Sequence, residues 1–153
     1  MFNIVRESRE SLPLRELVRL LDADLNSRYG IVQGQYDQYN SLATLDGVVI
    51  AYAAGQAVGC GCFRRFDDST AEIKRMFVRP ANRGSGPASL ILAELERWAV
   101  EAGFERAILE TGNLQPEAIR FYTKSGYSLI DNYGQYVGME HSVCMAKRLV
   151  QMV

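Results

Sequence analysis

The stretch that decides the fold is Glu72–Ala88, EIKRMFVRPANRGSGPA, where an apolar strand leads into a glycine-rich turn and the turn opens a helix. Pro80 ends the strand, which we expect over residues 71–79, because proline cannot continue a sheet ladder. Such a turn presents unpaired backbone N–H groups at a helix start, where the helix dipole adds about half a positive charge. The turn therefore predicts an anion site, with a phosphate as the natural occupant and Arg83 at its mouth.

On the amino-terminal side of this stretch, the pattern predicts three antiparallel strands in a row. Alternation and turn residues indicate a hairpin of 48–53 and 57–66 around Gly55–Gln56, and a second turn at 67–69 before the strand 71–79. Ser11 stands where an N-cap is expected, and Pro13 follows early, so the leucines at helical spacing predict a helix over 12–28. Residues 2–6 form a first strand, and 29–44 are expected to be loop or short helix.

On the carboxyl-terminal side, the strongest helix is predicted over 87–102, with Gly103 ending it. A short apolar strand at 107–109, a helix over 116–124 and a strand over 127–130 indicate a parallel crossover. A last strand over 142–149 could, if it is exposed, pair in a homodimer. The whole pattern predicts one mixed α/β domain over residues 1–153, with an antiparallel amino-terminal half and a βαβ-like centre.

Composition limits the classes of function. The 153 residues are 48% hydrophobic and 23% charged with a formal net charge of −1, which is typical of a globular domain and not of a nucleic-acid-binding one. The three cysteines, Cys60, Cys62 and Cys144, include no C-x-x-C pair, and His141 is the single histidine, so no metal site is expected. No secretory leader and no bilayer-length apolar run stand in the sequence, so we expect a cytoplasmic protein with no membrane partner.

The remaining cysteine and histidine positions indicate structural roles. Cys60 and Cys62 lie two apart in a predicted strand and so share one face, with Gly59 and Gly61 on the other, as small core residues do. His141, directly after Glu140, is expected at the surface.

Motifs that are absent from the sequence narrow the class of phosphate ligand that the turn could bind. No G-x-x-x-x-G-K-[ST] string occurs, so a P-loop is excluded. A dinucleotide fingerprint would need glycine or alanine at Ser89, although Glu110 at the end of the next strand would suit a ribose. A dinucleotide-binding enzyme is therefore the minor alternative.

Three segments together resemble the GNAT superfamily of N-acetyltransferases. Arg83–Ala88 fits the [QR]-x-x-G-x-[GA] motif of that family, Leu109–Gly112 is similar to its L-E-T-G segment, and Pro116–Tyr127 to its A-I-x-[LF]-Y-x-x-x-G-[FY] segment. The likeness is good over about 47–149 and looser before it. The resemblance implies an acyl-CoA N-acyltransferase fold, in which a twisted and mostly antiparallel sheet contains one splayed parallel pair and carries flanking helices.

The same resemblance implies acetyl-CoA as co-substrate and assigns its binding residues. The pyrophosphate would lie on the turn, and the pantetheine arm would run beside the preceding strand. The position that often holds a pantetheine-binding asparagine is Gln115 here, with Asn113 as the competitor. One departure is Pro87, which has no N–H to donate. The implied cofactor-binding residues are Met76, Phe77, Val78, Arg83, Gly84, Ser85, Gly86, Pro87, Ala88, Gln115 and Tyr122.

Two residues are expected to carry the chemistry. An amine must lose a proton before it attacks a thioester, and Glu72 lies on the strand where the resemblance puts a glutamate base. Its structural alternative is a cross-strand ion pair with Lys74 or Arg64. Tyr122 occupies the family's tyrosine position and would give a proton to the leaving thiolate; alternatively it is a half-buried helix tyrosine.

The acceptor is expected to be the primary amine of a small molecule or amino acid, and the alternatives are a peptide or protein amine. The fold resemblance gives acceptor binding to the first helix, the loop after it and the loop before the last strand. Carboxylates among tyrosines there would suit a cationic amine. A non-catalytic acetyl-CoA sensor is the alternative from another class. The residues concerned are Asp22, Asp24, Tyr29, Tyr36, Asp37, Tyr39, Tyr133, Tyr136 and Glu140.

Overall fold

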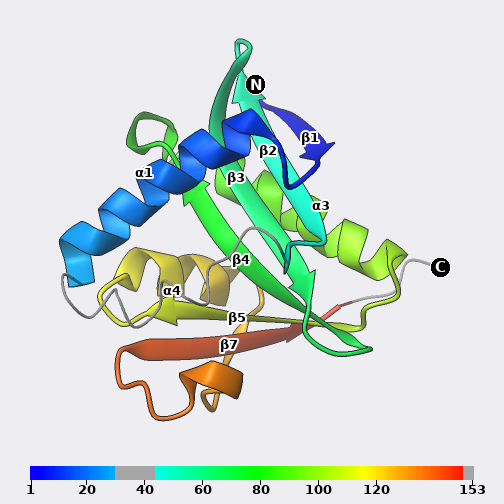
Figure 1. Cartoon of the computed structure of the whole chain (residues 1–153), viewed down its shortest axis with the longest axis vertical. Helices are drawn as coiled ribbons and strands as arrows, with labels where there is room; N and C mark the ends of the chain where they lie inside the picture. Colours follow the sequence, from blue (N-terminus) through cyan, green and yellow to red (C-terminus); the bar gives the residue numbers. More distant parts are fainter. Residues whose placement is uncertain (30–43, 150–153) are drawn as a thin grey trace.

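The computed structural model describes residues 1–29 and 44–149, which form a mixed sheet with helices on both faces (Figure 1). In chain order the elements are β1 (Asn3–Glu7), α1 (Leu12–Tyr29), β2 (Gly47–Ala53), β3 (Gln56–Arg65), β4 (Thr70–Val78), the short 3-10 helix η3 (Pro80–Asn82), α3 (Pro87–Glu101), β5 (Arg106–Gly112), α4 (Pro116–Lys124), β6 (Ser128–Ile130), the 3-10 helix η4 (Gly134–Tyr136) and β7 (Ser142–Arg148). The strand order is β1-β2-β3-β4-β5-β7-β6. Of the predicted loop or short helix at 29–44, residues 30–43 lie outside the described residues, and Tyr29 is the last residue of α1.

The antiparallel half of the sheet agrees with the sequence prediction. β1, β2, β3 and β4 are neighbours in that order and pair antiparallel. The β2–β3 turn lies one residue before the predicted Gly55–Gln56, because Ala54 and Gly55, with φ of 51° and 80°, form the left-handed pair that matches the twist of a two-residue hairpin, and Gln56 already belongs to β3. The predicted turn at 67–69 connects β3 to β4.

The hydrogen-bonded parallel pair of the sheet is not the pair of strands that the predicted crossover joins. β4 and β5 are the parallel neighbours, joined through α3. The predicted crossover from 107–109 through the helix 116–124 to 127–130 does join two strands that run in the same direction, but they are not neighbours, because β7 lies between β5 and β6 and pairs antiparallel with both. For the same reason the last strand is not an edge strand, and the expected pairing of an exposed last strand in a dimer is wrong.

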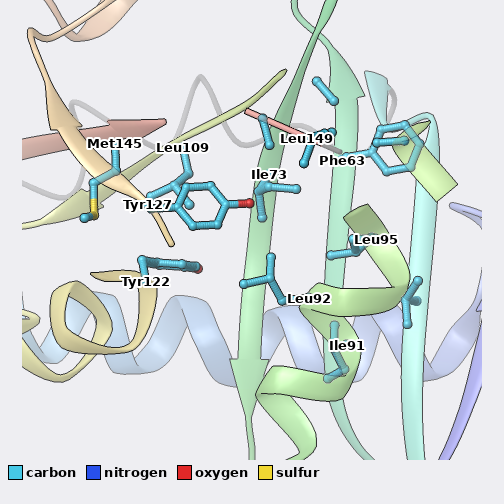
Figure 2. Close-up of a cluster of buried hydrophobic side chains, with 14 of the residues drawn as sticks. Phe63, Ile73, Ile91, Leu92, Leu95, Leu109, Tyr122, Tyr127, Met145 and Leu149 are labelled. Carbon is cyan, nitrogen blue, oxygen red and sulfur yellow. The ribbon is translucent and has the colours of Figure 1, made fainter. Parts of the chain in front are cut away.

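Each face of the sheet is covered by a different helix. α1 crosses one face, where Leu14, Leu17 and Leu21 pack on β2 and β3 with Cys60 and Cys62, both fully buried as predicted. Its N-cap is Ser11, whose Oγ accepts from the Leu14 N–H at 3.2 Å. α3 and α4 cover the opposite face, where a large apolar cluster joins the two helices to the sheet (Figure 2).

The functional region is opened by the divergence of β4 and β5 (Figure 1). Their ladder extends only from Thr70–Arg106 to Ile73–Leu109, although both strands continue beyond it. β4 bends directly after this point, because an extra residue stands in β4 where Cys60 pairs with Phe77 and Cys62 with Lys74. Arg75 in this bulge has φ of 59°. Beyond the ladder the two strands therefore separate, and the backbone N–H and C=O groups on their facing edges become available to a ligand.

None of the helices in residues 1–29 and 44–149 is long and apolar enough to cross a membrane.

Candidate active site

The glycine-rich turn forms an open cradle at the start of α3. Gly84 and Gly86 have φ of 82° and 98°, and a Cβ built on either glycine would meet no atom within 4 Å. Gly86 is the N-cap of α3, and Pro87 occupies the first turn, as the sequence indicates. Arg83 is anchored beside the turn, because its Nε donates to the Val78 carbonyl at 2.8 Å and its guanidinium lies 5.5 Å from the centre of the Phe77 ring.

A groove of about 460 Å³ runs from this turn along β4 to α4. Ten of the eleven predicted cofactor-binding residues line it: Met76, Phe77, Val78, Arg83, Gly84, Gly86, Pro87, Ala88, Gln115 and Tyr122. Ser85 lies in the turn but does not line the groove, since its Oγ donates to the Asn82 carbonyl at 2.7 Å. The two sequence segments of the predicted site, Met76–Ala88 and Gln115–Tyr122, are therefore brought to one groove.

A second cavity of about 130 Å³ lies on the α1 side of the opening between β4 and β5. It shares five lining residues with the groove: Leu21, Met76, Gln115, Ala118 and Tyr122. Polar side chains of β4 and β5, together with Tyr136 of η4 and His141, form the rest of its polar wall. A long ligand in the groove can thus present one end to a small molecule in the second cavity.

Glu72 lines the second cavity, but its carboxylate is fixed by two hydrogen-bond partners. Its side chain is 1% exposed, and its Oε1 accepts from Nε of Arg64, its cross-strand neighbour, at 2.7 Å. Its Oε2 accepts from the Tyr133 hydroxyl at 2.6 Å. The ion pair with Arg64 considered from the sequence is thus present, and both carboxylate oxygens are engaged.

Glu110 is a second carboxylate in the same cavity, and the sequence reasoning did not assign it a role in acetyl transfer. Its Oε2 accepts from the Ser142 hydroxyl at 2.8 Å. Burial raises the pKa of Glu110 to about 7, although Ser142 and the Lys74 ammonium act in the opposite direction. The available signal was a charged residue at the end of an apolar strand, within the L-E-T-G segment.

Lys74 lies on the same face of the sheet and is 9% exposed. Burial lowers the pKa of Lys74, while the charges of Glu72 and Glu110 act to raise it. Its Nζ is 3.5 Å from the Tyr136 hydroxyl. On the floor of the cavity, the acidic side chains of Glu72 and Glu110 therefore lie beside the basic side chain of Lys74.

Tyr122 lines both cavities from α4. It is 7% exposed, and burial raises its pKa, so the hydroxyl keeps its proton at neutral pH. It packs against Tyr127, with ring centres 5.7 Å apart (Figure 2).

The predicted acceptor residues divide into three groups. Tyr29 and Tyr136 line the second cavity, and Tyr133 contacts Glu72. Asp22 and Asp24 are instead paired with Arg75 and Arg28, and Glu140 is exposed. His141 is not a simple surface residue, because it lines the cavity and its ring packs on Tyr29 with centres 6.4 Å apart. Tyr36, Asp37 and Tyr39 lie outside the described residues.

Among the described residues, no group of three or more His, Cys, Asp and Glu side chains is placed to hold a metal ion.

Residues 14–127 match the model of the acetyltransferase (GNAT) family. The chain belongs to the GNAT family of acetyltransferases. It is thus an acetyl-CoA-dependent acyltransferase, and the fold and function class predicted by resemblance are confirmed.

Similar proteins match between 65% and 98% of this GNAT chain. An IAA acetyltransferase of Azospirillum brasilense is 32% identical over 148 residues, covering 95% of this chain and 97% of the relative. The uncharacterized N-acetyltransferase YsnE of Bacillus subtilis is 29% identical over 101 residues, covering 65% and 67%. The crystal structure of a proposed acyl-CoA N-acyltransferase from Klebsiella pneumoniae superposes with a TM-score of 0.82 at 28% identity, covering 98% of this chain and 99% of the other.

Proposed function

We propose that this GNAT enzyme moves the acetyl group of acetyl-CoA directly to the primary amine of a small molecule or amino acid. One observation carries the proposal: the long groove and the small polar cavity meet at Tyr122, Met76 and Gln115. A long thioester and a small acceptor can approach each other only at such a junction.

The groove fits coenzyme A. Gly84 and Gly86 leave open space at the start of the 15-residue helix α3, where N–H groups and the helix dipole favour the pyrophosphate. Met76–Val78 follow the end of the β4–β5 ladder, so their backbone edge suits the amides of the pantetheine arm. The CoA-bound N-acetyltransferase of Thermoplasma acidophilum has the same fold, with a TM-score of 0.73.

The cysteines of the chain are poorly suited to carry the acetyl group, which favours direct transfer to the amine. Acetyl-CoA supplies an acetyl group activated as a thioester. Cys60, Cys62 and Cys144 are buried, and burial raises the pKa of Cys60 to about 12 and of Cys144 to about 11. Since a thiolate is the nucleophilic form, these cysteines are poor acceptors of the acetyl group. The amine itself is therefore the nucleophile.

Acid–base chemistry is assigned to side chains around the second cavity. The amine must lose a proton, and Glu72, the candidate from the sequence, and Glu110 are the carboxylates that line the described cavity. Tyr122 keeps its proton at neutral pH and lies between the two cavities, which suits a proton donor to the departing sulfur.

The size of the cavity favours a small acceptor. About 130 Å³ is well below the roughly 300–1,000 Å³ of sites for drug-sized ligands. Its tyrosines and carboxylates suit a cationic amine. A peptide amine would enter this space only with its terminal group. The expected cytoplasmic location, the single domain and a homodimer stay predictions.

The test is release of free thiol from acetyl-CoA with small primary amines, amino acids, short peptides and IAA as acceptors. IAA is included because the relative from Azospirillum brasilense carries it in its name. The proposal expects release that depends on a small amine and a product heavier by one acetyl group. Faster acetylation of peptides would favour the peptide alternative, and tight binding of acetyl-CoA without release would favour a sensor; either result contradicts the proposal.

A further inference from the structure

Lys74 and Glu110 occupy the first positions beyond the β4–β5 ladder. The last ladder pair is Ile73 and Leu109, and these side chains belong to the apolar cluster under α3 and α4. Because side chains alternate along a strand, Lys74 and Glu110 point to the other face, where the second cavity lies. Glu110 thus stands where the two strands separate, in the wall of the second cavity.

The two carboxylates of the cavity differ in what already holds them. Glu72 accepts from the Arg64 guanidinium at 2.7 Å and from the Tyr133 hydroxyl at 2.6 Å. Both carboxylate oxygens of Glu72 are therefore already engaged by protein partners. Glu110 accepts from one neutral hydroxyl, that of Ser142, at 2.8 Å. Glu110 is also partly exposed whereas Glu72 is 1% exposed, so Glu110 is the carboxylate that an acceptor in the cavity can reach.

We propose that Glu110 is the general base of this enzyme and that Glu72 is a positioning residue, which holds Tyr133 and Arg64 beside the cavity. The inference rests on the proposed function, acetyl transfer to a small amine. It replaces the sequence-based candidate with a carboxylate on the neighbouring strand.

The proton balance is complete with these residues. An ammonium group of the acceptor gives one proton to the Glu110 carboxylate, which later releases it to water. The nitrogen lone pair then forms the C–N bond to the acetyl carbon as the C–S bond breaks, and the electron pair goes to sulfur. Tyr122 gives its proton to that sulfur and recovers one from the nitrogen, which loses two protons in all. The sum is one amide, one thiol and one proton.

The basicity of Glu110 is matched to this task. A primary ammonium has a pKa near ~10.4, and an ordinary glutamate near ~4.3 accepts its proton poorly. Burial raises the pKa of Glu110 to about 7, which reduces the mismatch. The titratable groups that face Glu110 are Glu72 and Lys74 from β4, Tyr136 from η4, Cys144 from β7, and His141, Tyr29 and Tyr122 around the cavity.

The first test observes the proton directly, without turnover. The full-length protein is labelled with ¹³C at its glutamate carboxyls and titrated by NMR in the absence of acetyl-CoA. We expect one carboxyl to titrate near pH 7, to be missing in Glu110→Gln and to be present in Glu72→Gln. If no glutamate titrates above about pH 6, or if the shifted signal survives in Glu110→Gln, the inference is wrong.

The second test is the pH profile of kcat/KM with the best small amine. In wild type and in Glu72→Gln, kcat/KM should fall as the pH drops below about 7. In Glu110→Gln this acidic limb of the profile should be absent, and kcat/KM should be lower by about 10²- to 10⁴-fold. Ser142→Ala removes a hydrogen bond that lowers the pKa of Glu110, so its limb and NMR signal should move to higher pH. This variant keeps the carboxylate and tests the inference even if Glu110→Gln does not fold.

The failures of the two proposals are distinguishable. An active wild type whose acidic limb persists in Glu110→Gln overturns the role of Glu110 and leaves the proposed function standing. A wild type that acetylates no small amine at any pH overturns both.

Discussion

Arg64 and Glu72 are direct cross-strand neighbours on β3 and β4, and Nε of Arg64 lies 2.7 Å from Oε1 of Glu72. Glu72 is 1% exposed, whereas the Arg64 side chain is 28% exposed. The pair therefore joins a fully buried carboxylate to a guanidinium that is partly exposed. This asymmetry determines what happens when either residue is changed.

Glu72→Gln should lower the free energy of unfolding by about 1–3 kcal/mol, because it removes a buried charge that accepts hydrogen bonds from both Arg64 and Tyr133. The measurement is urea unfolding at pH 7. Glu117→Gln is the control, since Glu117 pairs with Arg28 at 2.5 Å but is 50% exposed, and such pairs contribute about 0–1 kcal/mol. Equal losses in the two variants would contradict a structural role for the Arg64 pair.

Gly86→Ala should weaken acetyl-CoA binding by about tenfold or more, the equivalent of one lost charged hydrogen bond, as measured by calorimetry. The added methyl group meets no protein atom, but it occupies the open space over the turn. Gly103→Ala is the matched control, because Gly103 follows the same helix, has φ of 96° against 98° for Gly86, and is equally open.

Both alanine variants should be destabilised by roughly 1–2 kcal/mol, because alanine is strained in the left-handed backbone conformation. This strain is the same in the two variants, so a difference in their affinity for acetyl-CoA does not arise from it. An equal loss of affinity in Gly103→Ala would show that strain, and not the cradle, explains the result.

Tyr122→Phe should lower kcat/KM by about 10²-fold with little change in stability, because it removes the proton donor and keeps the packed ring. Tyr127→Phe is the control. Tyr127 packs against Tyr122 but lines neither described cavity, and its hydroxyl donates to Glu96 at 2.9 Å. That variant should lose about 1 kcal/mol of stability and keep its turnover. Full activity of Tyr122→Phe would remove this residue from the mechanism.

Glu110 should make stability depend on pH in a defined window. Its pKa is about 7 in the folded protein against 4.5 as the ordinary value, so the folded state holds the proton more tightly. The stabilisation is fully present below about pH 4.5 and is lost as the pH rises through about 7.

Glu110→Gln cannot ionise, so its stability relative to wild type should rise by an amount on the order of 3 kcal/mol between pH 4 and pH 8.5. Urea unfolding of both proteins at the two pH values measures this difference. A constant difference across the window would mean that Glu110 is not desolvated in the folded protein.

The parts of the fold that follow local rules could be predicted from sequence. Ser11, Pro87 and Gly103 gave helix ends close to those observed, because caps and helix-breaking residues act within one turn. The order of the last strands could not be predicted, because β7 enters between β5 and β6 from later in the chain. Strand adjacency is a tertiary choice, and the helix between β5 and β6 indicates only that the two run in the same direction.

The site divides in the same way. Arg83–Ala88 could be recognised because glycines in a strand-to-helix turn have a specific backbone use. Glu110 could not be distinguished from an ordinary strand-end glutamate, since its environment is supplied by Lys74, Ser142 and Tyr136 from other elements. The predicted acceptor carboxylates Asp22 and Asp24 have arginine partners that their sequence positions did not reveal.

The central claim is direct transfer from acetyl-CoA to an amine, and the most direct measurement is ¹³C NMR of a reaction with acetyl-CoA labelled at the acetyl carbonyl. With the small amine that releases most thiol, the thioester carbonyl signal should decrease as an amide signal of the acceptor increases at the same rate. Without the amine, the thioester should persist in the presence of the enzyme. Transfer of the label to the protein before any amine is added, or the absence of an amide product, would contradict the account.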